Sequence, residues 1–547
     1  MKRRDPTRLE REKFDLLIIG GGISGATLAW DASLRGLKVA LVDKGDFGGA
    51  TSSATSKLIH GGLRYLKNAE VRLVRESLRE RRILQGIAGH LVRPIPFLIP
   101  TFKHGNRKWM IRSGMLAYDL LGYDRRRLED PAQRIPRHRM LTNDQVLVAE
   151  PSVPAAGLTG GAVYYDCQCD PDRLTLEFII GASRNGAVVI NYARVGDLAC
   201  SLGHLASAEV VDLLSGKRYE VKARMTANVA GPWADRVDLL CGAGEKVTLK
   251  RSKGIHIITR PLTKEFAVVM RTDAGRHFFI IPWRGHSLIG TTDTEYQGEP
   301  DDLDVQAEDV QKFVDEINQA CPAAKLNAAA VKYRYAGVRP LVDQETQVYE
   351  ASRRYEIVDH YSRGLKGYIS ALGGKYTTSR NLARKLTNRI LARLDEPKAS
   401  CLTAHKLLPG SVSGSFGDYV EKRFLEERGL LPDDVLKQLI WTYGARHEDV
   451  LDLVREDSSL GEYVQDGRPE IMAQVAYAVH SEMACTLVDI LARRTGIATL
   501  GDPGDVAMNK VANLAAKLLG WGSERREREI AVCRDKIKGL PETGPGG

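Results

Sequence analysis

The stretch that decides the fold is residues 14–43, which read FDLLIIGGGISGATLAWDASLRGLKVALVD. An apolar run of strand-forming residues, Phe14 to Ile19, leads directly into the glycine-rich turn Gly20–Gly25 and then into a segment of helical composition. A second apolar run, Lys38 to Val42, ends in Asp43. This order of elements predicts the β-α-β unit of a doubly wound α/β fold.

The glycines and the acid have the spacing of a dinucleotide site. Gly20 permits a tight turn, Gly22 allows the backbone to approach a pyrophosphate, and Gly25 allows the helix to pack closely on the strand. The helix start offers unpaired N–H groups and a positive dipole end. Asp43 follows at the distance where a carboxylate accepts a ribose 2′-hydroxyl, so the unit predicts a bound dinucleotide.

Length and charge narrow the classes of protein. A chain of 547 residues is too long to fold around a single hydrophobic core, so we expect two or three domains. Its 43% hydrophobic and 27% charged residues are ordinary for a globular protein. Because 79 Lys and Arg exceed 69 Asp and Glu by 10, anionic partners are favoured. No RRM or zinc-finger signature accompanies this charge, so we expect no nucleic-acid partner.

Cysteine spacing and the apolar runs bear on metal and membrane. The eight cysteines are scattered, and the pair Cys167-x-Cys169 lacks both CxxC spacing and a second ligand pair. We therefore expect no metal site and reduced thiols in the cytoplasm. The segment Met1 to Lys13 has no apolar signal region, and no run reaches the ~18 apolar residues of a spanning helix. Any membrane association is expected to be peripheral.

A loop of small and hydroxyl residues, Gly48 to Leu66, follows the β-α-β unit. Such residues let backbone and hydroxyl groups bond a ligand closely, although a polar surface loop has a similar composition. The cluster of Lys57, His60, Arg64 and Tyr65 favours the ligand-binding loop.

Three further segments precede the second half of the chain. Val71 to Leu84 is predicted as a charged, solvent-facing helix, and the prolines of Pro94 to Pro100 predict an extended segment. A helix from Trp109 to Leu121 combines Trp, Met and Leu with basic flanks. Composition leaves open whether it lies in a bilayer interface, where apolar burial and attraction to anionic lipid add, or is a buried core helix with solvated arginines.

The second half contains strands of a separate sheet, at Arg251 to Thr259, Phe278 to Pro282 and Ser287 to Asp293. His256 lies among isoleucines, which by itself favours a core histidine. Arg339 stands in a Gly- and Pro-rich turn, where an arginine returning to a ligand is expected.

The chain then returns to the nucleotide half and ends in helices. A strand at Tyr368 to Leu372 and a Gly-Gly turn lead to a helix start that aims N–H groups and Lys375 at an anion. From Ala399 onward the sequence is helical without a further Gly-rich turn, which predicts a separate domain.

Several of these motifs together resemble the FAD-dependent glycerol-3-phosphate dehydrogenases over nearly the whole chain. The specific ones are Lys57-Leu58-Ile59-His60-Gly61-Gly62-Leu63-Arg64-Tyr65-Leu66, Lys253-Gly254-Ile255-His256, Ile289-Gly290-Thr291-Thr292-Asp293, Tyr335 to Pro340 and Gly373 to Thr378. The resemblance implies an α/β, two-domain FAD-binding oxidoreductase of the glutathione-reductase and D-amino-acid-oxidase type with an added all-α C-terminal domain. It also implies that sn-glycerol 3-phosphate is oxidised to dihydroxyacetone phosphate by hydride transfer to FAD, with membrane quinone as the final acceptor.

The resemblance implies roles for individual residues. His256, Arg339 and Lys375 are the expected catalytic residues, with His256 as proton acceptor unless neighbouring arginines lower the alcohol pKa instead. The expected substrate-binding residues are Arg64, Tyr65, His256, Arg339, Arg353 and Lys375. The expected cofactor-binding residues are Gly20, Gly22, Ile23, Ser24, Gly25, Asp43, Lys44, Thr51, Ser52, Ser53, Lys57, Leu58, His60, Gly61, Gly62, Val195, Ala230, Gly231, Trp233, Gly374, Lys375, Tyr376 and Thr377.

We divide the chain accordingly. Residues 14–398 form the oxidoreductase region, with FAD-binding parts at about 14–90, 155–240 and 341–398 and substrate-binding parts at about 91–154 and 241–340. Residues 399–538 form the helical domain, and 1–13 and 539–547 are expected to be flexible. We expect a homodimer bound to the inner face of the cell membrane through the helix from Trp109 to Leu121.

This chain departs from the family's pattern at Arg354, Ala54, Ala230, Ile255, Tyr376 and Ser379. Three rival functions stay open. A peroxide-forming glycerol-3-phosphate oxidase differs only in its acceptor, an amine or amino-acid oxidase shares the fold, and a flavin-binding scaffold would not turn over.

Overall fold

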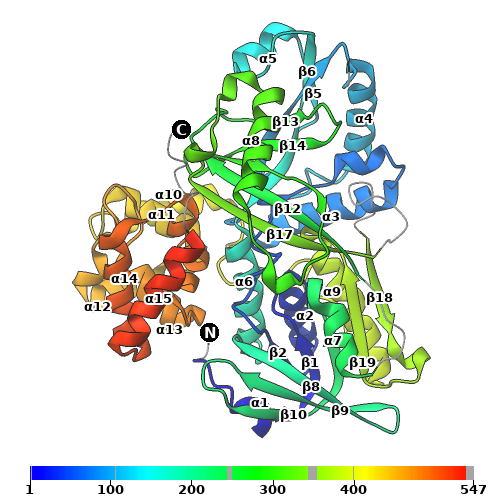
Figure 1. The fold of residues 1–547 in the computed structure, drawn as a ribbon, viewed down its shortest axis with the longest axis vertical. Coiled ribbons are helices and arrows are strands. Elements are labelled where there is room, and N and C mark those ends of the chain that lie inside the picture. Colours follow the sequence, from blue (N-terminus) through cyan, green and yellow to red (C-terminus); the bar gives the residue numbers. More distant parts are fainter. Residues whose placement is uncertain (2, 105, 243–248, 343–353, 398, 538–547) are drawn as a thin grey trace.

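The structure is a computed structural model that describes residues 1, 3–104, 106–242, 249–342, 354–397 and 399–537. Figure 1 shows three parts: a half built on a six-stranded sheet, a half built on a ten-stranded sheet, and a helical part beside them.

The predicted β-α-β unit forms the centre of the six-stranded sheet. β1 (Phe14–Ile19) leads through the glycine turn into α2 (Ile23–Leu34) and returns as β2 (Val39–Val42). β1 pairs in parallel with β2 on one side and with β11 (Ala223–Asn228) on the other. The sheet continues outward through β7 (Val188–Ile190), β19 (Tyr368–Gly373) and β18 (Tyr355–Asp359), in the order β18-β19-β11-β1-β2-β7.

Two layers, one on each face, bury this sheet. α2, α6 (Pro171–Arg184) and α9 (Ser379–Arg393) cover one face, and their apolar side chains join those of Leu16 and Ile18 in one core. The opposite face, with Leu17 and Ile19, packs on an antiparallel sheet of β8 (Ala193–Ser201), β9 (His204–Asp212) and β10 (Arg218–Val221). Because both faces are covered, β1 and β2 are apolar except for Asp15 near the start of β1, as expected for parallel strands.

The ten-stranded sheet forms the second half. Its main path is β16 (Thr294–Glu295), β12 (Lys250–Thr259), β15 (His286–Gly290), β14 (His277–Trp283), β13 (Ala267–Arg271), β4 (Val92–Phe102), β6 (Leu158–Cys169) and β3 (Leu58–Ile59). β17 (Tyr333–Leu341) pairs with β12, and β5 (Arg139–Leu141) pairs with β6. The strands predicted around residues 251–259, 278–282 and 287–293 are therefore present, in a sheet separate from the nucleotide sheet.

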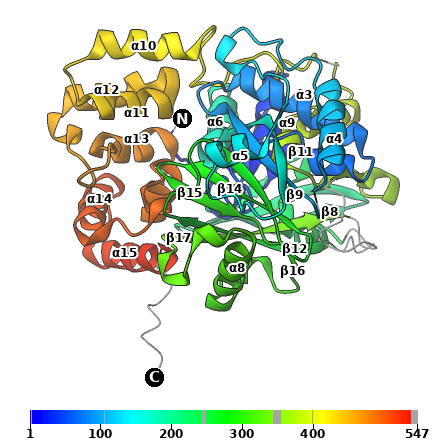
Figure 2. The same ribbon diagram turned by 90° about the horizontal axis from the view of Figure 1, so that it is seen from above.

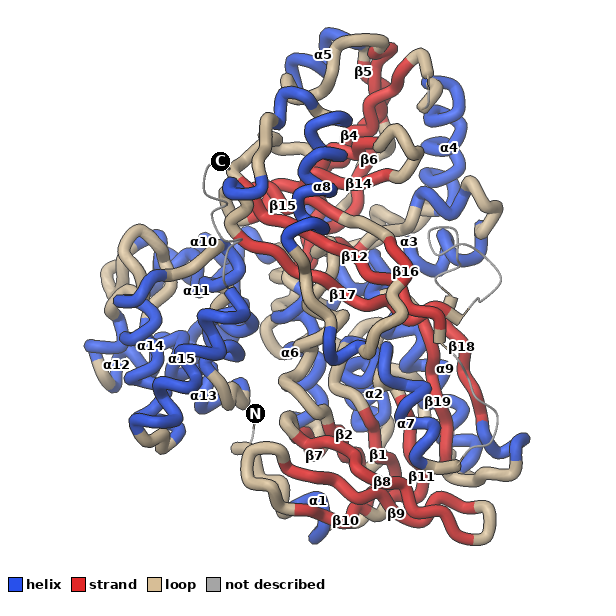
Figure 3. Tube along the Cα trace, in the orientation of Figure 1, coloured by secondary structure: helices blue, strands red, loops and turns tan. Residues whose placement is uncertain are grey.

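Helices cover both faces of this second sheet. α8 (Ala307–Ala320) packs Phe313 and Ile317 on one face, against Ile255 and Ile257 of β12. α3 (Val71–Ile87) and α4 (Lys108–Leu121) pack on the other face, which also carries Ile258. Figure 3 shows β12 and β17 running between the two halves. Even-numbered residues of β12 pair with odd-numbered residues of β17, and His256 and Tyr335 of this set bond to Ser56 and Thr55 of the loop after β2.

The environment predicted for α3 was wrong, whereas the extended segment with the prolines is present as a strand. α3 is not solvent-facing, because Glu80 and Arg81 are buried and paired with Arg380 and Asp166. The prolines at 94, 96 and 100 lie in β4, which pairs with β13 only at Phe97 and Leu98. All three prolines stand at even-numbered positions of β4, where the backbone N–H of a strand residue would point away from β6. Proline lacks this N–H, so the hydrogen bonds between β4 and β6 are kept.

The helical part comprises α10 (Phe416–Glu427), α11 (Asp433–Tyr443), α12 (His447–Glu456), α13 (Met472–Glu482), a π-helical turn η11 (Asp489–Arg494), α14 (Gly504–Leu519) and α15 (Ser523–Ile537). Two apolar cores hold it together. Figure 2 shows this part on one side of the molecule, and ion pairs of Glu482 with Arg173 and of Arg494 with Asp46 join it to the nucleotide half. The remaining short helices are α1 (Arg8–Arg11), α5 (Asn143–Ala149) and α7 (Ala234–Leu240).

Candidate functional site

The glycine turn after β1 is sterically dictated. Gly20 has a φ of +108°, and a Cβ there would lie 2.8 Å from the carbonyl oxygen of Val229. A Cβ on Gly25 would lie 1.8 Å from the carbonyl oxygen of Gly20, so only glycine allows the helix this close. Gly22 is the N-cap residue of α2, and it has no side chain that could occupy the N–H groups at the helix start. Ile23 and Ser24 begin the helix, whose first N–H groups point into the turn.

Asp43 is fixed by backbone donors at the end of β2. Its Oδ2 accepts the N–H of Gly21 at 2.6 Å and its Oδ1 accepts the N–H of Gly45 at 2.7 Å. Burial raises the pKa of this carboxyl to about 6. Each oxygen retains a lone pair for a further donor, so the carboxylate is oriented for a diol.

The loop from Thr51 to Gly62 connects the two halves. The hydroxyl oxygen of Ser52 accepts the N–H of Ile23 at 2.9 Å, at the start of α2. The hydroxyl of Thr51 donates to the carbonyl of Val338 on β17 at 2.7 Å. Ser53 bonds back to the carbonyl of Ala50 at 2.8 Å. One short loop therefore spans from the glycine turn to the second sheet.

His256 and Arg339 share one face of the second sheet. In the β12–β17 ladder, His256 lies opposite Tyr335 and Arg339 lies opposite Ser252. Alternate residues of a strand face the same side, so the two side chains project together. Their Cα positions lie about 13 Å apart along the ladder, and the guanidinium of Arg339 reaches back over Gly254.

His256 is buried and neutral. Its ring stacks on Tyr335 with centroids 4.9 Å apart, and its Nε2 lies 2.9 Å from the hydroxyl of Ser56. Burial, Arg339 and Lys57 hold the pKa of His256 well below its ordinary value. An imidazole that is neutral at physiological pH has one ring nitrogen available as a proton acceptor.

Arg339 is held by several oxygen atoms. Its Nη2 donates to the hydroxyl of Thr291 at 2.7 Å, and its Nη1 donates to the hydroxyl of Ser252 at 3.3 Å and to Asp293 at 3.4 Å. A guanidinium held in this way presents a fixed fork, which matches phosphate or carboxylate geometry.

A second group of predicted residues gathers at Lys375. Its Nζ lies 3.7 Å from the centre of the Tyr65 ring, is buried, and has no hydrogen-bond partner among the described residues. Burial lowers the pKa of Lys375 to about 8. The exposed guanidinium of Arg64 lies 4.8 Å from the same ring. A buried ammonium without a partner suits an anionic ligand that supplies one.

The residues around Lys375 join the loop to α9. The N–H of His60 donates to the hydroxyl of Thr377 at 3.3 Å, and burial lowers the pKa of His60 to about 3. Gly374 has a φ of +104°, and Tyr376 donates to the carbonyl of Pro171 at 2.7 Å. The start of α9 and the loop therefore form one surface.

Lys57 connects this surface to His256. It is buried, its Nζ lies 3.9 Å from a carboxylate oxygen of Asp172, and it lies 5.6 Å from the centre of the Tyr335 ring. Neighbouring Leu58 pairs with β6, Gly61 donates its N–H to Asp166 at 3.1 Å, and Gly62 has a φ of +74°.

Other predicted cofactor residues lie around the nucleotide sheet. Lys44 pairs with Asp301 at 2.5 Å and lies over the ring of Trp233, whose Nε1 donates to the same carboxylate. Ala230 and Gly231 continue the turn after β11, where the N–H of Ala230 donates to Asn228 at 3.2 Å. Val195 lies half-buried on β8.

Two of the expectations fall on parts of the chain that the structure does not describe. Arg353 lies outside the described residues, and its predicted role in substrate binding stays a prediction. The tail 539–547, expected to be flexible, also lies outside them. The neighbouring Arg354 is described; its side chain is 66% exposed and pairs with Glu70 at 3.6 Å.

These features fit FAD. The turn at Gly20 and Gly25 forms a cradle that a Cβ would fill, and Asp43 stands at its ribose end. At the other end, Lys375 Nζ and His256 Nδ1 are buried without hydrogen-bond partners in the described part of the chain. The turn and Asp43 would hold the nucleotide part of FAD, and Lys375 and His256 would offer polar partners at the other end of the site.

α4 presents an apolar surface. Trp109, Met110, Leu116 and Leu120 are exposed, by 68%, 45%, 57% and 75%, while Tyr118 packs inward. Within the described ranges, no helix has the length and apolarity to cross a membrane.

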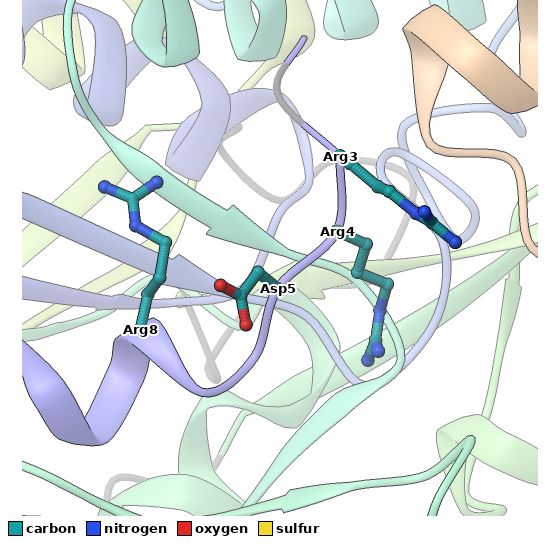
Figure 4. Close-up of a pocket in the computed structure, with 4 residues that line it drawn as sticks. All are labelled: Arg3, Arg4, Asp5 and Arg8. Atoms are coloured by element: carbon teal, nitrogen blue, oxygen red, sulfur yellow. The ribbon is translucent and has the colours of Figure 1, made fainter.

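Two other features lie apart from this site. A surface hollow lined by Arg3, Arg4, Asp5 and Arg8 opens beside the N-terminal segment, and its arginines and aspartate come from that segment alone (Figure 4). In the helical part, Glu427, His447 and Glu448 bring three potential metal-ligand atoms together. Arg423 already pairs with both carboxylates, which gives this cluster a cation without a metal.

Sequence reasoning missed several residues that shape the site. Ser56, Tyr335, Thr291 and Asp293 contact His256 or Arg339, yet we did not select them. Tyr335, Thr291 and Asp293 lie within the family motifs quoted above, and that position in a motif is the signal that could have identified them. Asp166, which binds Gly61, carried none.

Comparison with known proteins gives consistent results. The family described as FAD dependent oxidoreductase matches residues 15–380, and the C-terminal domain of alpha-glycerophosphate oxidase matches residues 401–526. The chain is 35% identical to a glycerol-3-phosphate dehydrogenase of Synechocystis, over 96% of this chain and 97% of the relative. It is 35% identical to an aerobic glycerol-3-phosphate dehydrogenase of Staphylococcus haemolyticus, over 89% and 87%.

Solved structures agree. The glycerol-3-phosphate dehydrogenase from Bacillus halodurans, complexed with FAD, superposes with a TM-score of 0.79 at 27% identity, covering 98% of both chains. Glycine oxidase from Geobacillus kaustophilus superposes with a TM-score of 0.53 at 19% identity, over 73% of this chain and all of the other. The latter shares the fold.

Proposed function

This chain belongs to the FAD-dependent glycerol-3-phosphate dehydrogenase family, and from that premise we propose that it oxidises sn-glycerol 3-phosphate to dihydroxyacetone phosphate and passes the electrons to membrane quinone. The membership confirms the predicted resemblance, the predicted fold class, and FAD as the cofactor. Substrate, acceptor and residue roles are the content of the proposal.

The observation that carries it is the shared sheet face of Arg339 and His256, opposite the loop that bears Ser56. We assign Arg339 to the substrate phosphate, because its fork is already oriented by Thr291 and Asp293. Arg64 and Lys375 add positive charge on the other side of the loop. Arg353 keeps its proposed place as a second phosphate ligand.

The chemistry requires a proton acceptor beside the reacting carbon. When bound, FAD supplies the hydride acceptor for C2 of the substrate. Neutral His256 accepts the proton of the C2 hydroxyl, and the hydroxyl of Ser56 at Nε2 orients the imidazole. Lys375, buried and without a partner in the described chain, stabilises negative charge that develops in the site. Tyr335 stacks on the imidazole ring of His256 and keeps water away from that face of it.

The apolar face of α4 supports the membrane part of the proposal. Four exposed apolar side chains with basic residues at the helix start suit an interface of anionic lipid, from which quinone is reached. We expect Leu116→Asp with Leu120→Asp to abolish sedimentation with phosphatidylglycerol vesicles. The matched control is Val148→Asp, which changes a side chain that is 76% exposed on α5. Equal loss in both proteins would contradict docking through α4.

Anaerobic addition of glycerol 3-phosphate tests the reaction. The visible absorbance of the oxidised flavin should bleach and should return on addition of a quinone analogue. A flavin that stays oxidised would refute the proposed activity and favour a scaffold.

A second candidate is a peroxide-forming glycerol-3-phosphate oxidase, because the match at residues 401–526 is to a domain of an oxidase. Stoichiometric peroxide without added quinone would establish it. A third candidate, an amine or amino-acid oxidase, would bind its substrate without a contact between Arg339 and a phosphate. If Arg339→Met bound the substrate with the same affinity as the parent protein, that class would be favoured.

A further inference from the structure

One of the contacts between the helical domain and the nucleotide half is made at a fully buried carboxylate, that of Asp46. We propose that Arg493 and Arg494 of this domain are positioning residues for FAD, because they hold the loop 43–49, which carries the ribose-binding Asp43, in its binding shape. This assigns a function to the helical domain and rests on FAD binding alone, independent of the substrate.

The contact is a four-donor clamp on Asp46. Arg494 donates from Nη1 to Oδ2 at 2.6 Å and from Nη2 to Oδ1 at 2.8 Å, as a bidentate fork. Arg493 donates from Nε to Oδ2 at 2.6 Å, and Asn191 donates to Oδ1 at 3.1 Å. The Asp46 side chain is fully buried, and that of Arg494 is 1% exposed. Bonds of this kind, between charges and out of water, are strong and geometrically specific.

The clamped loop is continuous with the cofactor cradle. Asp46 lies three residues after Asp43, whose Oδ1 accepts the N–H of Gly45. The N–H of Gly49 donates to the carbonyl of Asp46 at 3.0 Å, and the N–H of Gly48 donates to the carbonyl of Gly21 at 3.0 Å. Gly21 in turn donates to Asp43 at 2.6 Å. A shift of Asp46 is therefore transmitted to both the ribose acid and the glycine turn.

The arginines are themselves rigidly held by the helical domain. Arg494 also donates from Nε and Nη2 to the carbonyl of Glu482, at 3.2 and 3.0 Å. Arg493 also donates to Asp489, whose other oxygen accepts the N–H groups of Cys485 and Thr486. Through the two arginines, loop 43–49 is therefore anchored to the backbone at the end of α13 and to η11.

Charge gives the clamp a second effect. Although burial acts in the opposite direction, Arg494 and Arg493 hold the pKa of Asp46 well below its ordinary value, so it is ionised. Asp43, three residues earlier, is a second acid and is half-buried. Two neighbouring carboxylates without two cations would repel each other and the diphosphate of FAD. The arginines thus provide both geometry and charge.

The experiment measures FAD release from holoenzyme. Arg494→Lys keeps the charge and removes the fork, and Arg493→Lys does the same at a less buried position. We expect the equilibrium dissociation constant for FAD, followed by the rise of free-flavin fluorescence on dilution, to increase roughly 10- to 100-fold in Arg494→Lys, the equivalent of about one charge-assisted hydrogen bond. Turnover at saturating FAD should stay near that of the parent.

The matched control is Arg446→Lys. Arg446 belongs to the same domain and its side chain is 3% exposed. It pairs with Glu177 of α6 and with Glu482 of α13 and donates to the hydroxyl of Tyr477, and these three partners lie outside loop 43–49. We expect Arg446→Lys to lower the thermal midpoint as much as Arg494→Lys does, while FAD release stays unchanged. Equal FAD loss in both variants would show general destabilisation and overturn the proposal. Unchanged FAD affinity in Arg494→Lys, or in Arg493→Lys if Arg494→Lys does not fold, would also overturn it.

Discussion

Gly254 determines where Arg339 lies, so Gly254→Ala tests the phosphate assignment without removing a charge. A Cβ at this position would lie 1.9 Å from Nη2 and 2.4 Å from Cζ of Arg339. The backbone at Gly254 lies outside the left-handed region, so alanine is strained only by this contact.

The size of the effect follows from the required shift. The guanidinium must move by about 1.5–2 Å to reach ordinary van der Waals contact with the new methyl group. That shift breaks the 2.7 Å bond to Thr291 and misaligns the fork with the substrate phosphate. Loss of one charge-assisted hydrogen bond costs about 1.5–3 kcal/mol, which raises KM for glycerol 3-phosphate roughly 10- to 150-fold.

Steady-state kinetics with a quinone analogue measure this change, with flavin content and thermal midpoint recorded for the same protein. The matched control is Gly417→Ala in α10, where the nearest atom to the added Cβ is 3.7 Å away. It should leave KM unchanged. A KM for Gly254→Ala within about twofold of the parent, at equal flavin content, would refute the role of Arg339, since twofold is below half a kcal/mol.

Three further predictions concern charge and proton transfer. Lys375 has a pKa of about 8, so its ammonium is lost as pH rises through that value, and kcat/KM should fall above it; Lys375→Arg should remove this alkaline limb, and an unchanged limb would assign it to another group. Ser56→Ala leaves His256 Nε2 without its partner, so the pH profile of kcat should shift while KM changes little; a change in KM alone would contradict an orienting role. Arg81→Met leaves Asp166 buried without its cation, which should cost about 3–5 kcal/mol in the urea-measured free energy of unfolding; a change below about 1 kcal/mol would show that the carboxyl is protonated or solvated instead.

Local pattern was sufficient where a segment's structure depends on its own residues. The strand, turn and helix of residues 14–43 were predictable because glycine positions and apolar periodicity act within a few residues. The same holds for the helices of the C-terminal part, such as Asp433–Tyr443 and Gly504–Leu519.

α3 shows where local pattern is insufficient. Its charges predicted a solvent-facing helix, but Glu80 binds Arg380, 300 residues away, and Arg81 binds Asp166. Periodicity cannot distinguish a solvated charge from one that has a distant buried partner. The exposed face of α4 was left open for the same reason, because only packing shows which side of an amphipathic helix is covered.

The sequence by itself determined the dinucleotide unit, the ligand loop and the family, because these are contained in contiguous motifs. Only the tertiary structure placed His256 and Arg339 on one sheet face, through the pairing of β12 with β17, and connected Asp46 to Arg494. These partners are separated by about 80 to 450 residues, and contacts at such separations are decided by how sheets and domains pack.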